Sequence, residues 1–112
     1  GADALSFKDR LTMETAKSIR EDYLHQNAFH EVDTFTSLKK QYKILKIIYD
    51  FHRLSNDALV KGAEFGDIIN LPVREKIGRA KYVPENEIGT LDDLSDEIKA
   101  SLTELCKGDN NE

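Results

Sequence analysis

The stretch that decides the fold is LKKQYKILKIIYDFHRLSNDALVK, residues 38–61, in which apolar residues recur at helical spacing. Two apolar stripes run along it, one made of Leu38, Tyr42, Leu45, Tyr49 and His52 and the other of Ile44, Ile48 and Phe51. Spacings of three and four residues place each stripe on one helix face. The helix is predicted to end near Lys61, because Gly62 can adopt the left-handed conformation that closes a helix. Its wide apolar surface favours the central position in a helical bundle.

A first helix is predicted upstream of this stretch. Ser6 and Asp9 have the spacing of a capping box, in which the serine hydroxyl accepts a hydrogen bond from the Asp9 amide. Apolar residues then follow at spacings of three and four, namely Met13, Ala16, Ile19 and Tyr23. They define one face of this helix, and the pattern fades near Gln26.

The segments between the helices carry loop and turn signals. Residues 27–36 mix Asn, Asp and Thr with apolar residues, which predicts an ordered loop before a helix start at Thr34 or Thr36. Beyond the central helix, a short helix is indicated by Phe65, Ile68 and Ile69. Pro72 marks a second short helix, because proline is tolerated in a first turn, where its missing N–H is not needed.

The last helix has the most regular amphipathic pattern in the sequence. Its apolar residues are Leu91, Leu94, Ile98, Leu102 and Leu105. Thr90 and Asp93 form a second candidate capping box, and Gly108 is expected to end the helix. Strand-like alternation is absent from the sequence. We therefore predict an all-α fold in one domain, residues 1–112: a bundle of about four to six helices with two long central helices and a C-terminal amphipathic helix.

Composition excludes several classes of function. The chain has 112 residues, of which 39% are hydrophobic and 33% charged, as in globular rather than disordered proteins. Its net charge of -5, without a basic cluster, argues against a nucleic-acid partner. The longest apolar run, Ile47-Ile48-Tyr49, is far below the roughly 20 residues that span a bilayer, so membrane association is expected only through partners. The single cysteine, Cys106, favours a reducing, cytoplasmic setting.

Residues that could perform chemistry are sparse. His25, His30 and His52 have no carboxylate or cysteine at a known ligand spacing, so no metal site is predicted. The sequence has no glycine-rich phosphate loop that could hold a triphosphate. The acidic group in residues 92–97 is interpreted as favourable charge at a helix N-terminus and a solvated face. We predict no catalytic residue.

Phe29 and Phe35 bracket the predicted loop and leave two interpretations open. Both rings can anchor the loop by packing into the bundle, which the physics of the residues alone favours. Alternatively, one or both can present an aromatic face to a flat ligand such as a purine base.

Several motifs resemble the C-terminal part of the catalytic A subunit of archaeal-type and vacuolar-type rotary ATP synthases. They are Ala4-Leu5, Asp9-Arg10-Leu11-Thr12, Ile19-Arg20-Glu21-Asp22-Tyr23-Leu24, Gln26-Asn27-Ala28-Phe29, Val32-Asp33-Thr34-Phe35, Lys40-Gln41-Tyr42-Lys43, Leu71-Pro72-Val73-Arg74-Glu75 and Lys81-Tyr82-Val83-Pro84-Glu85. They extend to about Glu87, whereas the last helix matches only in general character. The later motifs favour the archaeal type.

The resemblance implies a role for the loop. In related catalytic subunits, a Gln-Pro-Phe turn followed six residues later by a second aromatic closes over the adenine ring, and Phe29 and Phe35 reproduce this spacing. Gln26, Asn27, Phe29 and Phe35 are therefore the expected adenine-facing residues. The turn reads Gln-Asn-Ala-Phe here, so the resemblance does not decide which ring stacks.

The resemblance also implies contacts with partners. Residues 3–9 are similar to a degenerate form of the acidic lever segment that faces the rotor, and Leu5, Phe7 and Asp9 are the expected rotor-facing residues. The implied partners are the B subunits of an alternating A3B3 hexamer and the central stalk, on the cytoplasmic side of a membrane. ATP or ADP with magnesium is expected on the full-length subunit, which couples ATP synthesis or hydrolysis to proton or sodium transport, and none on this segment alone.

Two other classes of protein are weighed against this reading. The runner-up is a free-standing helical module for protein-protein interaction, docking through the apolar stripe of the last helix, and an independent hydrolase ranks third. The sequence begins at Gly1 rather than a methionine, which favours an excised segment that lacks the nucleotide-binding core. A longer reading frame upstream with a phosphate loop would support the synthase subunit.

Overall fold

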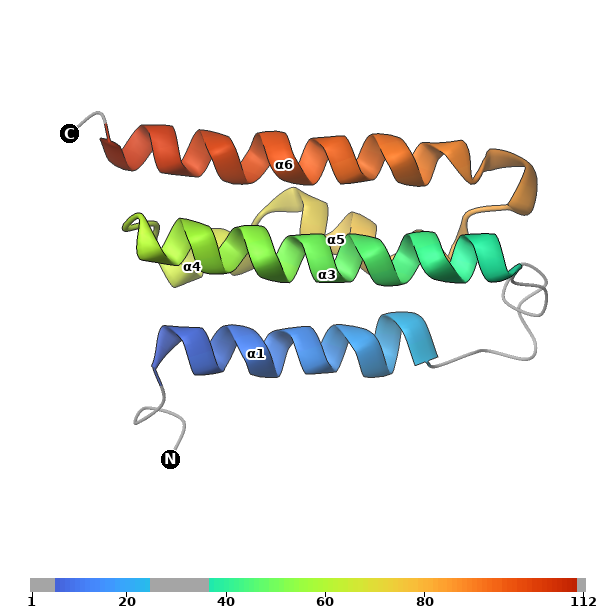
Figure 1. The fold of residues 1–112 in the computed structure, drawn as a ribbon, viewed down its shortest axis with the longest axis horizontal. Coiled ribbons are helices and arrows are strands. Elements are labelled where there is room, and N and C mark those ends of the chain that lie inside the picture. The colour runs from blue at the N-terminus through green and yellow to red at the C-terminus, as the bar shows by residue number, and fades with distance from the viewer. Residues whose placement is uncertain (1–5, 25–36, 111–112) are drawn as a thin grey trace.

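The computed structural model describes residues 6–24 and 37–110, and the regular structure in these ranges is entirely helical (Figure 1). Its α-helices are α1 (Phe7–Ser18), α3 (Leu38–Val60), α4 (Phe65–Ile69), α5 (Pro72–Gly78) and α6 (Gly89–Asn110). A π-helical turn, η2 (Ile19–Leu24), extends α1, and the 3₁₀ turns η3 (Ala80–Tyr82) and η4 (Glu85–Glu87) connect α5 to α6. The predicted all-α helical bundle is confirmed.

The helices form a flat bundle in which α3 lies between α1 and α6, with α4 and α5 behind it (Figure 1). The molecule measures 46 × 33 × 18 Å along its principal axes. The end of η2 and the start of α3 lie at the same end of the bundle, whereas α1 begins at the opposite end (Figure 1). The two sides of the segment 25–36, which lies outside the described residues, are thus anchored at one end of the molecule.

The hydrophobic core is shared by α3, α6 and the short helices behind them. Its larger side chains are Ile44, Ile47, Ile48, Phe51, Ile68, Val73, Ile77, Leu91, Leu94, Ile98 and Leu102. Leu105 packs against this core while partly buried. The predicted apolar face of the last helix is therefore confirmed, and so are the two short helices, with Pro72 in the first turn of α5.

The central helix α3 confirms one of its two predicted stripes as core. Ile44, Ile48 and Phe51 are buried, but Leu38 is 82%, Tyr42 66% and Tyr49 60% exposed. The predicted central position of this helix is confirmed, but only one of its two apolar stripes is covered (Figure 1). The flat bundle has α1, α6 and the short helices around α3 but leaves this stripe open on one side.

The N-terminal end of α3 differs from the prediction, whereas its C-terminal end agrees with it. The helix is capped by Ser37, whose Oγ accepts a hydrogen bond from the Lys40 amide at 3.0 Å. The predicted start at Thr34 or Thr36 was therefore wrong. At the other end, Gly62 has a φ of 102°, as predicted for the residue that closes this helix.

The first helix begins as predicted but turns a different face to the core. The Asp9 amide donates to Ser6 Oγ at 3.1 Å, which confirms the cap. Met13 is 59% exposed and Ala16 is exposed, whereas Leu11 is buried. The predicted face was therefore wrong in its first half. The packed face includes the polar residue Thr15 on the same side as Leu11, so the apolar spacing indicated the neighbouring face instead.

Both predicted boundaries of α6 need correction. The helix begins at Gly89, and Thr90 lies inside it with its hydroxyl donating to the Glu87 carbonyl at 2.8 Å. Thr90 is therefore not the N-cap, because η4 already leads into the helix. At the other end, α6 continues through Gly108 to Asn110. A helix can pass through glycine at a cost of about 1 kcal/mol relative to alanine, so Gly108 need not stop it.

Candidate functional site

The predicted rotor-facing residues lie at the start of α1, except Leu5, which is outside the described residues. Phe7 is 54% exposed, and its ring stacks on that of Phe65 in α4 with centroids 5.7 Å apart. The Arg10 guanidinium lies over the Phe7 ring at 5.6 Å. Asp9 is exposed in the first helical turn. The structure therefore anchors Phe7 to α4 while half of its surface remains accessible.

The predicted adenine-facing residues Gln26, Asn27, Phe29 and Phe35 lie outside the described residues, and so do His25 and His30. Before these residues, the described chain ends at Leu24. After them, it begins again at Ser37, which caps α3 with its side chain. These two positions lie at the end of the bundle opposite the start of α1 (Figure 1). The two flanks of the segment 25–36 and the start of α1, where Phe7 and Asp9 lie, are therefore at opposite ends of the bundle (Figure 1).

The chain enters the segment 25–36 through the π-helical turn η2. A π-helical turn is wider than an α-helical one, is rare, and occurs frequently at functional sites. Within it, Ile19 and Tyr23 pack against the core while partly buried. The turn is thus held in place by apolar contacts before the chain leaves the described range.

The first turn of α3, which follows that segment in the sequence, contains a buried lysine. Lys40 is 0% exposed, and its Nζ donates to the carbonyl oxygen of Lys81 at 2.6 Å. A buried ammonium group needs such a partner, because its transfer from water is costly. No role for Lys40 was predicted from the sequence, although the residue belongs to the motif Lys40-Gln41-Tyr42-Lys43. The available signal was a lysine three positions after the helix cap, on the face of the helix that packs against the rest of the bundle.

Asp22 in η2 carries a carboxyl group whose pKa is raised above 3.8, first of all because burial disfavours the charged form. The hydrogen bond with Ser18 opposes this shift in pKa, and Glu21 adds to it through like charge. Lys81 and Arg74 contribute smaller opposing attractions. Since the folded state favours the protonated form, the charged Asp22 lowers stability at neutral pH, and this loss disappears as the pH falls towards 3.8.

We expect Asp22→Asn to raise the melting temperature at neutral pH, because the amide removes a partly buried charge and keeps an oxygen that can accept from Ser18. The gain should shrink as the pH falls towards 3.8, where Asp22 becomes protonated in both the folded and unfolded states. Thermal unfolding of the two proteins, followed by circular dichroism across this pH range, measures the difference. A lower melting temperature of the variant at neutral pH would show that attraction to Lys81 and Arg74 exceeds the cost of burial.

His52 has a packing role in the structure. Its Nδ1 lies 2.6 Å from Thr15 Oγ1, which joins α3 to α1, and its Nε2 lies 3.1 Å from Asn56 Nδ2. Among residues 6–24 and 37–110, no group of three or more His, Cys, Asp or Glu side chains is placed to hold a metal ion.

Two acidic residues in the first half of α6 make ion pairs with other helices. Asp92 contacts Lys43 of α3 at 2.7 Å, and Glu97 contacts Lys76 of α5 at 2.7 Å. The hydrogen bond with Lys43 holds the pKa of Asp92 below its usual value. These carboxylates therefore tie α6 to its neighbours on an exposed face.

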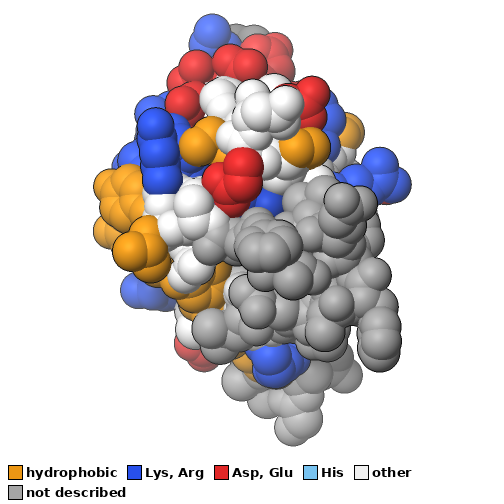
Figure 2. All heavy atoms as spheres, turned by 90° about the vertical axis from the view of Figure 1, so that its right-hand side faces the viewer, with side chains coloured by type: hydrophobic (Ala, Val, Ile, Leu, Met, Phe, Trp, Pro, Cys, Tyr) orange, Lys and Arg blue, Asp and Glu red, His pale blue; other side chains and the backbone are white. Residues whose placement is uncertain are grey.

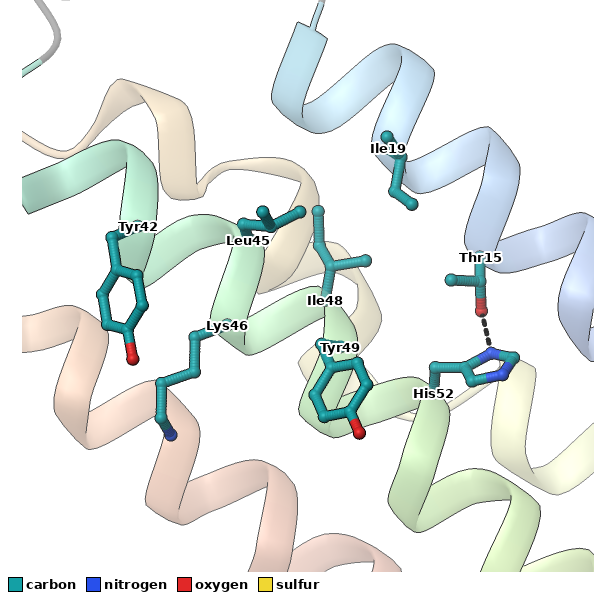
Figure 3. A pocket seen from close by; sticks show the side chains of 8 residues that line it. All are labelled: Thr15, Ile19, Tyr42, Leu45, Lys46, Ile48, Tyr49 and His52. Atoms are coloured by element: carbon teal, nitrogen blue, oxygen red, sulfur yellow. Dashed lines mark hydrogen bonds between the residues drawn. The ribbon is translucent and has the colours of Figure 1, made fainter. Parts of the chain in front are cut away.

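An apolar groove between α1 and α3 was not identified from the sequence. It is lined by Thr15, Ile19, Tyr42, Leu45, Lys46, Ile48, Tyr49 and His52 (Figure 3). Tyr42 and Tyr49, two turns apart on α3, extend to the same side with Lys46 between them (Figure 3). Seen from the end of the bundle, hydrophobic side chains gather on one side at mid-height, with Lys or Arg beside them (Figure 2). The exposed aromatic residues in the stripe of residues 38–52 were the signal for it.

The helices give one further negative result. In the part of the chain that the structure describes, no helix is both long enough and apolar enough to cross a membrane.

Comparison with known proteins assigns this bundle to a class. Residues 1–65 match the family described as the C-terminal domain of V and A type ATP synthase. This match covers more than half of the 112 residues, and the chain belongs to this family.

Similar proteins are alpha chains of V-type ATP synthases. The one from Thermoanaerobacter pseudethanolicus is 54% identical over 108 residues, which are 96% of this chain and 18% of that protein. Those from Acetivibrio thermocellus and Clostridioides difficile are 55% and 52% identical over 94% and 96% of this chain. The chain thus spans only about a fifth of the length of these relatives, 18% in each case.

Proposed function

We propose that this chain is the C-terminal helical domain of the catalytic alpha chain of a V-type ATP synthase, which couples ATP synthesis or hydrolysis to proton or sodium transport. The observation that carries the proposal is the 54% identity to such an alpha chain over 96% of this chain. The catalytic groups would lie in the remaining part of the alpha chain, together with the site for ATP or ADP and magnesium. The domain alone is expected to hydrolyse no ATP.

At the nucleotide end, the proposed contacts are Gln26, Asn27, Phe29 and Phe35. The described elements on either side of these residues, the end of η2 and the start of α3, lie at the same end of the bundle (Figure 1). An aromatic ring stacked on a base contributes about 1–3 kcal/mol, so Phe29 or Phe35 could provide a measurable part of nucleotide affinity.

At the other end, Leu5, Phe7 and Asp9 are proposed to face the central stalk. Half of the Phe7 surface is accessible and its ring is held by stacking on Phe65, which suits a residue that contacts the stalk sterically. The neighbouring partners would be B subunits of an A3B3 hexamer. The domain would then belong to the peripheral part of the complex, on the cytoplasmic side of the membrane.

A hybrid alpha chain tests the proposal. In it, this chain replaces the corresponding segment of the Thermoanaerobacter pseudethanolicus protein, and ATP hydrolysis is measured in the assembled synthase. We expect the hybrid to turn over ATP, and Phe29→Ala to weaken nucleotide binding by about 1–3 kcal/mol through lost stacking. Tyr49→Ala, which removes an exposed ring from α3, is the matched control and should leave nucleotide affinity unchanged.

The outcomes separate the parts of the proposal. A hybrid that assembles but does not turn over ATP would contradict the assignment of the domain. A hybrid that works while Phe29→Ala lowers only its thermal stability would show that Phe29 is a packing residue.

A further inference from the structure

The first helix is attached to the bundle differently from the other long helices. α1 has one buried residue, Leu11, among its 12 residues, whereas α3 has eight among its 23. The buried members of the hydrophobic core cluster come from residues 44–102, and Leu11 is not one of them. Ile19 and Tyr23 of η2 pack against the cluster while only partly buried. α1 and η2, residues 7–24 (the arm), therefore contribute little apolar surface to the core.

Polar contacts hold the middle of the arm. Glu14 Oε2 accepts a hydrogen bond from Arg74 Nη2 of α5 at 3.0 Å, and Thr15 Oγ1 lies 2.6 Å from His52 Nδ1 of α3. The side chains of Arg74 and Glu14 are 22% and 34% exposed, so water reaches both groups as soon as the contact opens. A polar contact of this kind contributes little net stability, because hydrogen bonds to water replace it.

The two ends of the arm make contacts that stay exposed to solvent. At its start, the ring of Phe7 stacks on that of Phe65 of α4 while 54% exposed. At its end, Lys81 Nζ donates to the carbonyl oxygen of Glu21 at 3.2 Å, again on the surface. α1 lies at one edge of the flat bundle, beside α3 (Figure 1). An element in this position can move outward without displacing α6.

The length of α1 determines what happens when it detaches. Isolated helices shorter than about 12–15 residues are marginal in water, and α1 has 12 residues. Detachment from α3 should therefore be accompanied by loss of the helix itself. The other helices do not depend on the arm in the same way, because Ile47 of α3 and Ile98 of α6 are buried in the cluster that these helices share with α4 and α5.

We propose that the arm is a separately opening unit of the fold, which detaches and unfolds while α3, α4, α5 and α6 remain packed on one another. The two polar contacts in its middle set how often it opens. Proteins open locally in such cooperative units, at free energies below that of global unfolding. Phe7 and Asp9 belong to the arm, so opening displaces them without unpacking the core, whether or not they face a central stalk.

Limited proteolysis of the intact chain tests the proposal. Trypsin cleaves after Lys and Arg, and residues 25–36 contain neither, so cleavage near the arm reports on the arm itself. Cleavage requires local opening, and its rate follows the population of the open form. By mass spectrometry, we expect the first cuts after Lys17 and Arg20 to be about tenfold or more faster than those after Lys46 and Arg53 of α3. All four side chains are exposed, so accessibility of the side chain alone does not separate them.

Variants of the polar contacts give the second part of the test. Thr15→Val removes the hydroxyl and Glu14→Gln removes the charge, each with little change of shape. Both should accelerate cleavage in the arm several-fold and leave cleavage in α3 unchanged. Asp92→Asn is the matched control, because it breaks an exposed ion pair of 2.7 Å between α6 and α3 and should leave cleavage in the arm unchanged.

Three results would contradict the proposal. Equal initial rates in the arm and in α3 would show that the chain opens only by unfolding as a whole. Acceleration of both regions by the same factor in Thr15→Val and Glu14→Gln would show that these contacts stabilise the entire bundle. Rapid cleavage in the arm that neither variant changes would overturn the role of the two contacts.

Discussion

Replacing Ile98 by alanine should lower the free energy of unfolding by about 2–5 kcal/mol, the range for truncating a large aliphatic side chain in a core. Ile98 is 0% exposed and lies in the middle of α6, where this helix packs on α3. The variant loses the transfer free energy of three carbon atoms and leaves a cavity that a close-packed bundle cannot fully close. Urea denaturation followed by circular dichroism at 222 nm, a wavelength that reports helix, measures this loss.

Leu38→Ala is the control for Ile98→Ala. Leu38 is 82% exposed at the start of α3, so its truncation should change stability by no more than about 0.5 kcal/mol. Equal losses in the two variants would mean that α6 does not pack as described, or that the exposed stripe of α3 is covered in solution.

Replacing Lys40 by methionine should cost about 1.5–3 kcal/mol of stability, the range for a hydrogen bond to a charged group. Methionine retains most of the buried stem but leaves the Lys81 carbonyl without the donor that now lies 2.6 Å away. Because the site is buried, water cannot replace the lost donor without a rearrangement. The loss should appear in the same denaturation measurement, without a change in the slope that reports exposed surface.

Lys39→Met isolates the effect of burial from that of charge. Lys39 is the exposed neighbour of Lys40 on α3, and its substitution removes the same charge from the same helical turn. We expect a change within about 0.5 kcal/mol. A Lys40→Met variant as stable as the native protein would show that the cost of burying the ammonium group cancels its hydrogen bond.

Helical periodicity predicted the class of fold because each long helix has apolar residues with one dominant spacing. In α6 those residues are also the ones that are buried, so pattern and packing agree. In α1 they do not, because Thr15 lines the packed side while the more hydrophobic Met13 faces water. In α3 the sequence contains more apolar surface than the bundle covers. Periodicity places residues on a common face, but it does not determine which face meets a neighbour.

The candidate site was harder to predict from the sequence for a different reason. Contacts such as Lys81 with Glu21, or Glu85 with Ser37, join residues whose pairing follows only from the path of the chain. Charged residues occur throughout this sequence, and no spacing in the sequence distinguishes Lys81 and Glu85 from the other charged residues. The motif Lys81-Tyr82-Val83-Pro84-Glu85 was visible as part of the resemblance. Its hydrogen bonds to η2 and to the cap of α3 could be identified only from the structure.

The smallest dimension of the bundle, 18 Å, affects how its backbone exchanges hydrogen with water. A helix with its side chains is about 10–12 Å across, so this thickness leaves room for fewer than two complete layers. Most amides are then within one helix of the solvent, and slow exchange should be confined to the turns of α3 and α6 that face each other around Ile47 and Ile98. Hydrogen–deuterium exchange should therefore find protected amides only along the middle of the bundle. The amides on both sides of them should exchange through local opening.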